Sequence, residues 1–313
     1  MAYRFSAKDP TVTDGVRRIA AEEFAAIEAA LSDPAMPAAR KVHESRKATK
    51  RLRALLRLTA AAFPGAPAEI DALRDAAASL SALRDKGALS ETLARLEMPA
   101  DIETRIGKAI SRRRAVSAAE SRRLLAAFAD DAASAAGRAS EWSFDRDGWK
   151  AIGPGLAKGY RRFADALAEA RDARDEEPVH DLRKRAKDHW YQTLLLRGVF
   201  PDVMDGYAAA GERLCDDLGD WRDLGLLEAE VSQLTARQLG AAHAEEALGR
   251  ISKARRRALR RAFRTARRLA SESPDAYAAR IRAWWQLAHL KKSGRSAKLR
   301  PDRIRHWTDD QKA

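Results

Sequence analysis

The segment VHESRKATKRLRALLRL, residues 42–58, combines one histidine with regularly spaced basic residues and a stripe of leucines. On an α-helix, at about 100° per residue, the histidine and four basic residues fall within an arc of roughly 80°. These residues are His43, Arg46, Lys50, Arg53 and Arg57. The opposite side carries Ala48, Leu52, Leu55 and Leu56, an apolar stripe of the kind that a helix buries in a bundle. The segment therefore predicts a helix with one packed face and one cationic face.

A second segment, VHDLRKRAKDHWYQTLLL at residues 179–196, repeats this design. His180, Arg183 and Lys187 occupy the same arc, and Lys184 lies close to it. The positions that correspond to the last two arginines of the first arc hold Trp190 and Leu194. The second cationic face is therefore shorter, and packing is the favoured role for the tryptophan over stacking on a ligand.

Helix is the expected structure almost everywhere, because Ala, Leu, Arg and Glu dominate and β-branched residues are sparse. We expect an all-α protein with helices in two sets of four. The expected helices run near 14–31, 38–63, 67–97 and 102–138, and near 152–175, 178–198, 204–236 and 240–290.

Three anchors recur in the same order along the chain and indicate an internal duplication of about 140 residues. Arg17-Arg18 corresponds to Arg161-Arg162, the two motif histidines correspond, and Leu83-Arg84-Asp85 corresponds to Trp221-Arg222-Asp223. We expect a first four-helix repeat at 10–147, a second at 148–298, and terminal arms at 1–9 and 299–313. The Arg-Asp pairs are assigned an orienting role, through ion pairs, in preference to direct contact with a ligand.

The charge balance favours an anionic partner. The 313 residues include 59 Lys and Arg against 45 Asp and Glu, a formal net charge of +14. No segment is apolar enough to cross a membrane, and Cys215 is the only cysteine, so we expect a soluble cytoplasmic protein without disulfides or a cysteine-based metal site. Cys215 is expected to be a small buried residue, and no cofactor or metal is predicted.

Evenly spaced cations along a helix suit a linear polyanion, because each phosphate oxygen accepts charge-assisted hydrogen bonds from Arg or Lys. The two histidines would add donors as the pH falls. A solvated basic face with ordinary carboxylate partners such as Glu44 or Asp181 is the alternative. The basic run at 250–268 could extend the electropositive surface or be merely solvated. Secondary candidates for anion contact are Arg18, Arg162, Arg256 and Arg260.

Two other functions compete with this hypothesis. A groove that neutralises phosphates would also attract nucleic acid non-specifically, although aromatic residues make up only 6% of the chain and stacking on bases is poorly supported. The dipeptide His180-Asp181 resembles part of a metal phosphohydrolase site, but such a site needs several converging ligands. The remaining histidines do not suggest one, His189 being placed on the packed side of its helix, so we expect no enzyme.

The motif V-H-x-x-R-x-x-x-K, carried twice and followed each time by Arg-Asp, resembles that of the conserved histidine α-helical domain (CHAD) family. The resemblance covers nearly the whole chain. It implies two four-helix bundles related by a pseudo-two-fold axis, with a basic central groove or pore that binds inorganic polyphosphate without catalysis, at polyphosphate granules. By position, the groove would be lined by His43, Arg46, Lys50, Arg53, His180, Arg183 and Lys187.

The second motif departs from the family pattern at its end. It reads Lys-Asp-His-Trp-Tyr at 187–191, where the family usually continues Lys-Arg-Leu-Arg-Tyr, so Asp188, His189 and Trp190 are expected to weaken the cationic face. The Glu-x-Glu-x-Lys signature of the triphosphate-tunnel domain found in many members is also absent from the sequence. The chain therefore resembles a stand-alone module.

Overall fold

The computed structural model describes residues 3–83, 85–112, 116–172, 176–234 and 238–290. Within these residues the chain forms eleven α-helices and two short 3-10 helices, and no strand, so the predicted all-α class is confirmed. The first seven elements are α1 (Val12–Ser32), α2 (Ala38–Thr59), α3 (Ala66–Ser79), η1 (Leu80–Leu83), α4 (Asp85–Ala94), α5 (Ala100–Arg112) and α6 (Ala118–Ser140). The others are α7 (Trp149–Asp172), α8 (Glu176–Leu195), η2 (Arg197–Val199), α9 (Pro201–Ser232), α10 (Ala241–Leu269) and α11 (Pro274–Leu290).

Three of the eight expected helices are interrupted, so the expected number was wrong. The helix expected at 67–97 tightens into η1 before α4 begins. The helix expected at 102–138 divides into α5 and α6, and Ser117 caps α6 by accepting a hydrogen bond from the Glu120 backbone N–H. The helix expected at 240–290 divides into α10, which ends at Leu269, and α11, which begins at Pro274, a residue favoured in the first turn of a helix.

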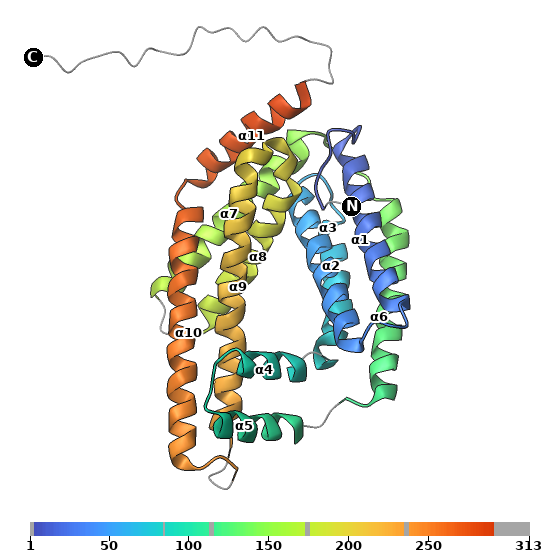
Figure 1. Ribbon diagram of the computed structural model, residues 1–313. Coiled ribbons are helices and arrows are strands. Elements are labelled where there is room, and N and C mark those ends of the chain that lie inside the picture. Colours follow the sequence, from blue (N-terminus) through green and yellow to red (C-terminus); the bar gives the residue numbers. More distant parts are fainter. Residues whose placement is uncertain (1–2, 84, 113–115, 173–175, 235–237, 291–313) are drawn as a thin grey trace, which may run out of the picture.

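The helices form two groups that lie on opposite sides of the molecule (Figure 1). In the first group α1 contacts α2 and α6, and α3 also contacts α2 and α6. In the second group α8 contacts α7 and α9, while α10 contacts α9 and α7. Helix α2 joins the groups through its contacts with α7 and α8, and α11 packs on α7.

The contact between α2 and α7 depends on Gly155. A Cβ atom at this position would overlap the backbone carbonyl of Leu58, the next-to-last residue of α2. Glycine therefore permits the two helix backbones to touch. This close approach positions α2, which carries the first motif, against the second group of helices.

Helices α4 and α5 lie beside the lower ends of α9 and α10 in Figure 1 and pack against them. Ile102, Ile106 and Ile110 of α5 are fully buried and belong to the same cluster as Leu227 and Ile251. Residues that precede the midpoint of the chain therefore complete a core whose other wall comes from the last third.

The segment before α1 is not helical, but its described part is docked on the core. The Tyr3 hydroxyl donates a hydrogen bond to the Arg51 carbonyl at 2.6 Å, and the Phe5 backbone N–H donates to Leu195 at 2.9 Å. Both side chains are buried, and the Phe5 ring packs edge-on against Trp285. The residues expected as an N-terminal arm therefore contact both groups of helices, whereas the expected arm at 299–313 lies outside the described residues.

Across the described helices, none combines the length and the apolar character needed to span a membrane.

Candidate anion-binding site

The two motif segments form α2 and α8, which lie in contact. Helix α2 begins after Pro37, whose carbonyl accepts the backbone N–H groups of Arg40 and Lys41 at 2.9 and 3.0 Å. It buries Val42, Ala48, Leu52, Leu55 and Leu56, as the apolar stripe predicted. Helix α8 buries Val179, Leu182, Ala186 and His189. This packing leaves the basic side of each helix available for the site.

Basic side chains from three helices converge on Lys50. Its pKa is lowered to about 7, first because burial removes the ammonium from water and then because four nearby cations repel its charge. These cations are Lys187, Arg46, Arg183 and Arg222. Lys50 forms no ion pair with a carboxylate of the described residues. The folded protein therefore concentrates positive charge around a partly buried amine.

Lys187 of α8 lies in a similar environment. Burial is the largest cause that lowers its pKa, and repulsion by Arg183 acts in the same direction, whereas Asp216 and Asp223 oppose it. Its ammonium lies 5.6 Å from the centre of the Trp190 ring, which stacks on Tyr191. Trp190 therefore packs within the protein, with the Lys187 ammonium over its ring.

The arginines of the site differ in how they are held. Arg46 donates to the Ala77 carbonyl of α3 at 2.7 Å, which fixes the guanidinium between two helices. The buried Nε atoms of Arg53 and Arg183 have no hydrogen-bond partner among the described residues. Burial lowers the pKa of Arg53, and the nearby Arg57 adds to this effect. These two N–H groups are therefore unused donors inside the folded protein.

Arg57 and Asp188 form an ion pair across the two motif helices, with 2.9 Å between Nη1 and the carboxylate oxygen. Burial raises the pKa of Asp188, and Arg57, Arg185, Arg53 and Arg162 act in the opposite direction. Arg57 is therefore already engaged by a carboxylate of the second motif helix.

The two motif histidines occupy different environments. His43 is exposed, whereas His180 is half-buried with its ring edge-on to Trp221 of α9, at 4.9 Å between ring centres. Burial lowers the pKa of His180, as do Arg183, Lys184 and Arg255, while Glu176 opposes them. The His180 ring is therefore harder to protonate than a free imidazole. Lys184 is exposed and lies 4.0 Å from Asp181.

The secondary candidates lie outside this cluster. Arg18 is held by Asp9 at 2.8 Å and by Glu22 at 3.0 Å, so it anchors the segment before α1. Arg162 is exposed on α7. Arg256 and Arg260 are exposed on α10, where Arg256 donates to the Ser252 hydroxyl at 2.6 Å.

The structure adds Arg222 to the site. It pairs with the neighbouring Asp223 of the same helix at 3.1 Å, and its charge also acts on Lys50. The recurrence of Arg-Asp after each motif was the sequence signal for this residue, and its proximity to the motif helices was missed. Arg84, the corresponding arginine, lies outside the described residues.

Two interior residues behave as predicted. Cys215 is buried, which raises the pKa of its thiol to about 12. His189 is buried against the Phe163 ring at 5.0 Å, and burial lowers its pKa to about 4. Over the part of the chain that the structure describes, no three His, Cys, Asp or Glu side chains converge in a way that could hold a metal ion.

The fold and this cluster define an all-α protein that gathers basic side chains from several helices at one place. The CHAD domain model matches residues 18–232, and the chain belongs to the CHAD family, whose domains are generally non-catalytic binding domains. A crystal structure of the CHAD domain from the plant Ricinus communis has a similar fold, with a TM-score of 0.54 and 19% sequence identity. That match covers 91% of this chain and 96% of the other. No curated protein sequence matches the chain significantly.

Proposed function

We propose that the protein binds inorganic polyphosphate, without chemical conversion, at the junction of α2 and α8. The observation that carries this proposal is the convergence of four cations on Lys50, which has no ion-pair partner among the described residues. Like charges at this density disfavour the folded state until an anion neutralises them. Membership of the CHAD family supports polyphosphate as that anion.

The mechanism is capture of a flexible anionic chain at equilibrium. Successive phosphates accept hydrogen bonds from Arg46, Arg183 and Lys187, while the negative charge favours the protonated form of Lys50. Arg53 and His43 continue the same face of α2 on either side of these contacts. A longer chain reaches more of these cations at once, so its affinity should rise with length until the face is filled.

We further propose that the two groups of helices are duplicated four-helix units with a basic groove between them. In support, the motif helix is the second helix of each group and contacts the first and third helices of its own group. In cells, this surface would associate the protein with polyphosphate granules in the cytoplasm. A fluorescent fusion of the protein should colocalise with polyphosphate granules. Substitution of Lys50 and Lys187 should make its fluorescence diffuse.

Calorimetric titration of long-chain polyphosphate, pyrophosphate and duplex DNA at moderate salt tests the proposal. The variant is the double substitution Lys50→Met with Lys187→Met, which removes both partly buried charges and keeps much of the side-chain volume. The matched control is Lys150→Met with Lys158→Met, two exposed lysines on α7. Thermal unfolding of both variants shows whether each remains folded.

The Lys50→Met, Lys187→Met variant should lose polyphosphate affinity by at least tenfold. It should unfold at the same or a higher temperature than the wild type, because two mutually repelling charges have been removed. The control should change affinity by less than about threefold, which is the scale of exposed charges. Equal losses of polyphosphate affinity in both variants would indicate that the anion is attracted by the overall positive charge, and would contradict a binding site at Lys50. Displacement of polyphosphate by duplex DNA would favour nucleic-acid binding instead.

A further inference from the structure

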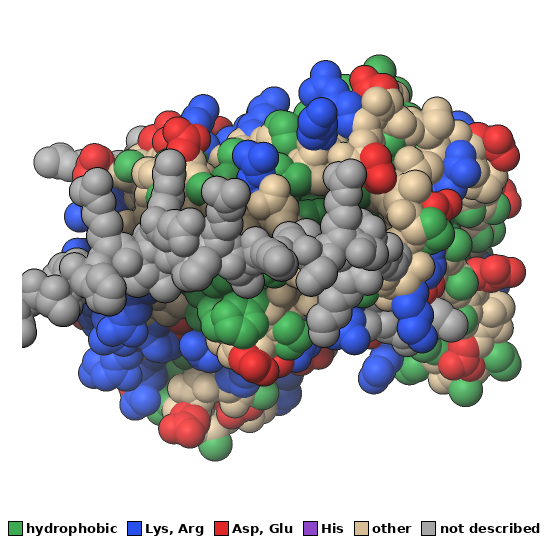
Figure 2. Space-filling model, turned by 90° about the horizontal axis from the view of Figure 1, so that it is seen from above, with side chains coloured by type: hydrophobic (Ala, Val, Ile, Leu, Met, Phe, Trp, Pro, Cys, Tyr) green, Lys and Arg blue, Asp and Glu red, His purple; other side chains and the backbone are tan. Residues whose placement is uncertain are grey.

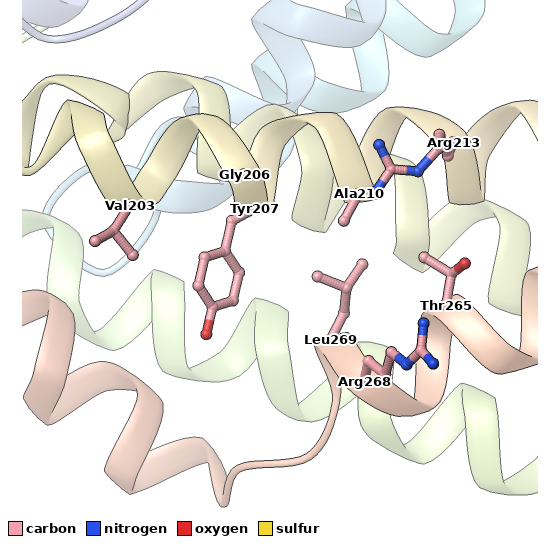
Figure 3. Close-up of a pocket in the computed structure, with 8 residues that line it drawn as sticks. All are labelled: Val203, Gly206, Tyr207, Ala210, Arg213, Thr265, Arg268 and Leu269. Atoms are coloured by element: carbon pink, nitrogen blue, oxygen red, sulfur yellow. The ribbon is translucent and has the colours of Figure 1, made fainter.

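A pocket lies between α9 and α10, lined by none of the residues that surround Lys50 (Figure 3). Its volume is about 390 Å³, within the size range of small-molecule sites. Figure 3 shows Tyr207 of α9 and Leu269 of α10 pointing into the space between the helices, with Arg213 and Arg268 near one end. The remaining walls are Val203, Gly206, Ala210 and Thr265.

Both arginines of this pocket are exposed, and neither forms an ion pair with a carboxylate of the described chain. Their neighbours differ: Arg261 pairs with Asp217 at 2.7 Å, and Arg280 pairs with Glu272 at 2.5 Å. The sequence thus supplies carboxylates to nearby arginines and leaves the two at the pocket available for an external anion.

The pocket borders a basic stripe on the outer side of α10. At about 100° per residue, six basic residues of this helix fall within an arc of roughly 100°. They are Lys253, Arg257, Arg260, Arg264, Arg267 and Arg268. None forms an ion pair with a described carboxylate, and the opposite side of the helix buries Ala258, Ala262 and Ala266. Figure 2 shows Lys and Arg side chains densest at one corner of the face seen from above. The stripe makes the potential at the pocket positive.

The apolar wall of the pocket is fixed before any ligand arrives. Arg280 of α11 donates to the Tyr207 hydroxyl at 3.2 Å, and its guanidinium lies 5.1 Å from the centre of that ring. The phenolic proton remains available for donation to a ligand. Gly206 leaves room beside the ring, because a Cβ atom there would meet no atom within 4 Å.

We propose that this pocket binds an organic phosphate of the nucleoside triphosphate class. The planar apolar part lies against Tyr207 and Leu269, and the phosphates meet Arg213, Arg268 and then the stripe of α10. The combination of a fixed aromatic wall and two available guanidiniums selects a ligand that carries both parts. This site does not depend on the function proposed for Lys50.

Calorimetric titration of the full chain with ATP, tripolyphosphate and adenosine tests the pocket. Arg213→Gln with Arg268→Gln should weaken ATP binding by at least tenfold, since two charge-assisted contacts are lost. Gly206→Leu should weaken ATP binding similarly by filling the pocket. Gly249→Leu is its control, because this exposed glycine of α10 is also open, and it should leave ATP affinity unchanged.

Two further measurements distinguish this pocket from the cluster around Lys50. Gly206→Leu should weaken ATP binding more than tripolyphosphate binding, because it fills the space for the planar part of ATP and leaves Arg213 and Arg268 in place, and the Lys50→Met, Lys187→Met variant should retain ATP binding. The pocket assignment would be overturned if the Lys50→Met, Lys187→Met variant lost ATP binding while Gly206→Leu retained it. It would also be overturned if the wild type did not bind ATP. Adenosine binding as tightly as ATP would overturn the assignment to phosphates. Thermal unfolding establishes that each variant is folded.

Discussion

Arg57 of α2 and Asp188 of α8 form an ion pair that joins the two helices carrying the repeated histidine motif, with 2.9 Å between the bonded atoms. The side chains are only 23% and 18% exposed. The aspartate that interrupts the basic pattern of the second motif therefore has a structural role in the junction. It also removes one cation from those available to a polyanion.

Asp188→Asn should have opposite effects on stability and binding. The free energy of unfolding should fall by about 1–3 kcal/mol, because the partly buried Arg57 loses its charged partner. Polyphosphate affinity should rise, because Arg57 becomes available and a nearby negative charge disappears. Urea unfolding and calorimetry measure the two effects. Asp75→Asn is the control, since Asp75 pairs with Arg74 at an exposed site, and a parallel gain in affinity there would contradict the local explanation.

The lowered pKa of Lys50 predicts how stability and binding depend on pH. Between pH 7 and 10.5 the unfolded chain holds this proton more tightly than the folded chain, so the free energy of unfolding should rise with pH through that range. Lys50→Met should remove this part of the pH dependence and stabilise the protein at pH 7 by about 1–3 kcal/mol. Urea unfolding at a series of pH values, wild type against variant, checks both effects.

Binding of polyphosphate should be coupled to uptake of a proton by Lys50. The anion raises the pKa of Lys50 from its value of about 7 in the free protein, so binding at pH 8 should take up protons and affinity should fall as the pH rises further. Calorimetry in buffers with different ionisation enthalpies measures this uptake. Persistence of the full uptake in Lys50→Met would assign the proton to another group.

Gly155→Ala tests the contact between α2 and α7. The added methyl group overlaps the Leu58 carbonyl, so we expect the free energy of unfolding to fall by about 1–3 kcal/mol despite the higher helix propensity of alanine. Gly137→Ala in α6 is the control, because its Cβ would meet no atom within 4 Å, and it should stabilise by up to about 1 kcal/mol. Urea unfolding measures both variants. If the midpoints of Gly155→Ala and Gly137→Ala moved in the same direction, Gly155 would not be needed for close contact between α2 and α7.

Phe5→Ala tests the docking of the segment before α1. Removing the buried ring should lower the free energy of unfolding by about 3 kcal/mol. The neighbouring exposed Lys8→Ala should change it by no more than about 0.5 kcal/mol. Thermal or urea unfolding is sufficient, and a negligible effect of Phe5→Ala would show that this segment adds little to the core.

Helix periodicity made the all-α class and the buried face of each motif helix predictable. Leu52 and Val179 are buried for the reason that the pattern indicates, namely that one side of each helix is apolar. The pattern could not show which cations carry internal partners. Arg57 meets an aspartate 131 positions away, and Arg222 reaches Lys50 through tertiary packing. Such contacts depend on how helices meet, which a single helix face does not encode.

The N-terminal segment was misjudged for a related reason. Tyr3 and Phe5 are only two large residues in a short segment without a helical period, yet both are buried against elements that are distant in sequence. Short irregular segments of this kind are fixed by the surface that they cover, so their own composition says little about their order.

The packing of α4 and α5 against α9 and α10 has a consequence for synthesis of the chain. A ribosome delivers residues in order, so Ile102, Ile106 and Ile110 emerge long before Leu227 and Ile251, which cover them in the finished protein. At about 5–20 residues per second, these isoleucines wait for several seconds without their partners. The nascent first half is thus the stage at which this protein is most exposed to aggregation and most dependent on chaperones.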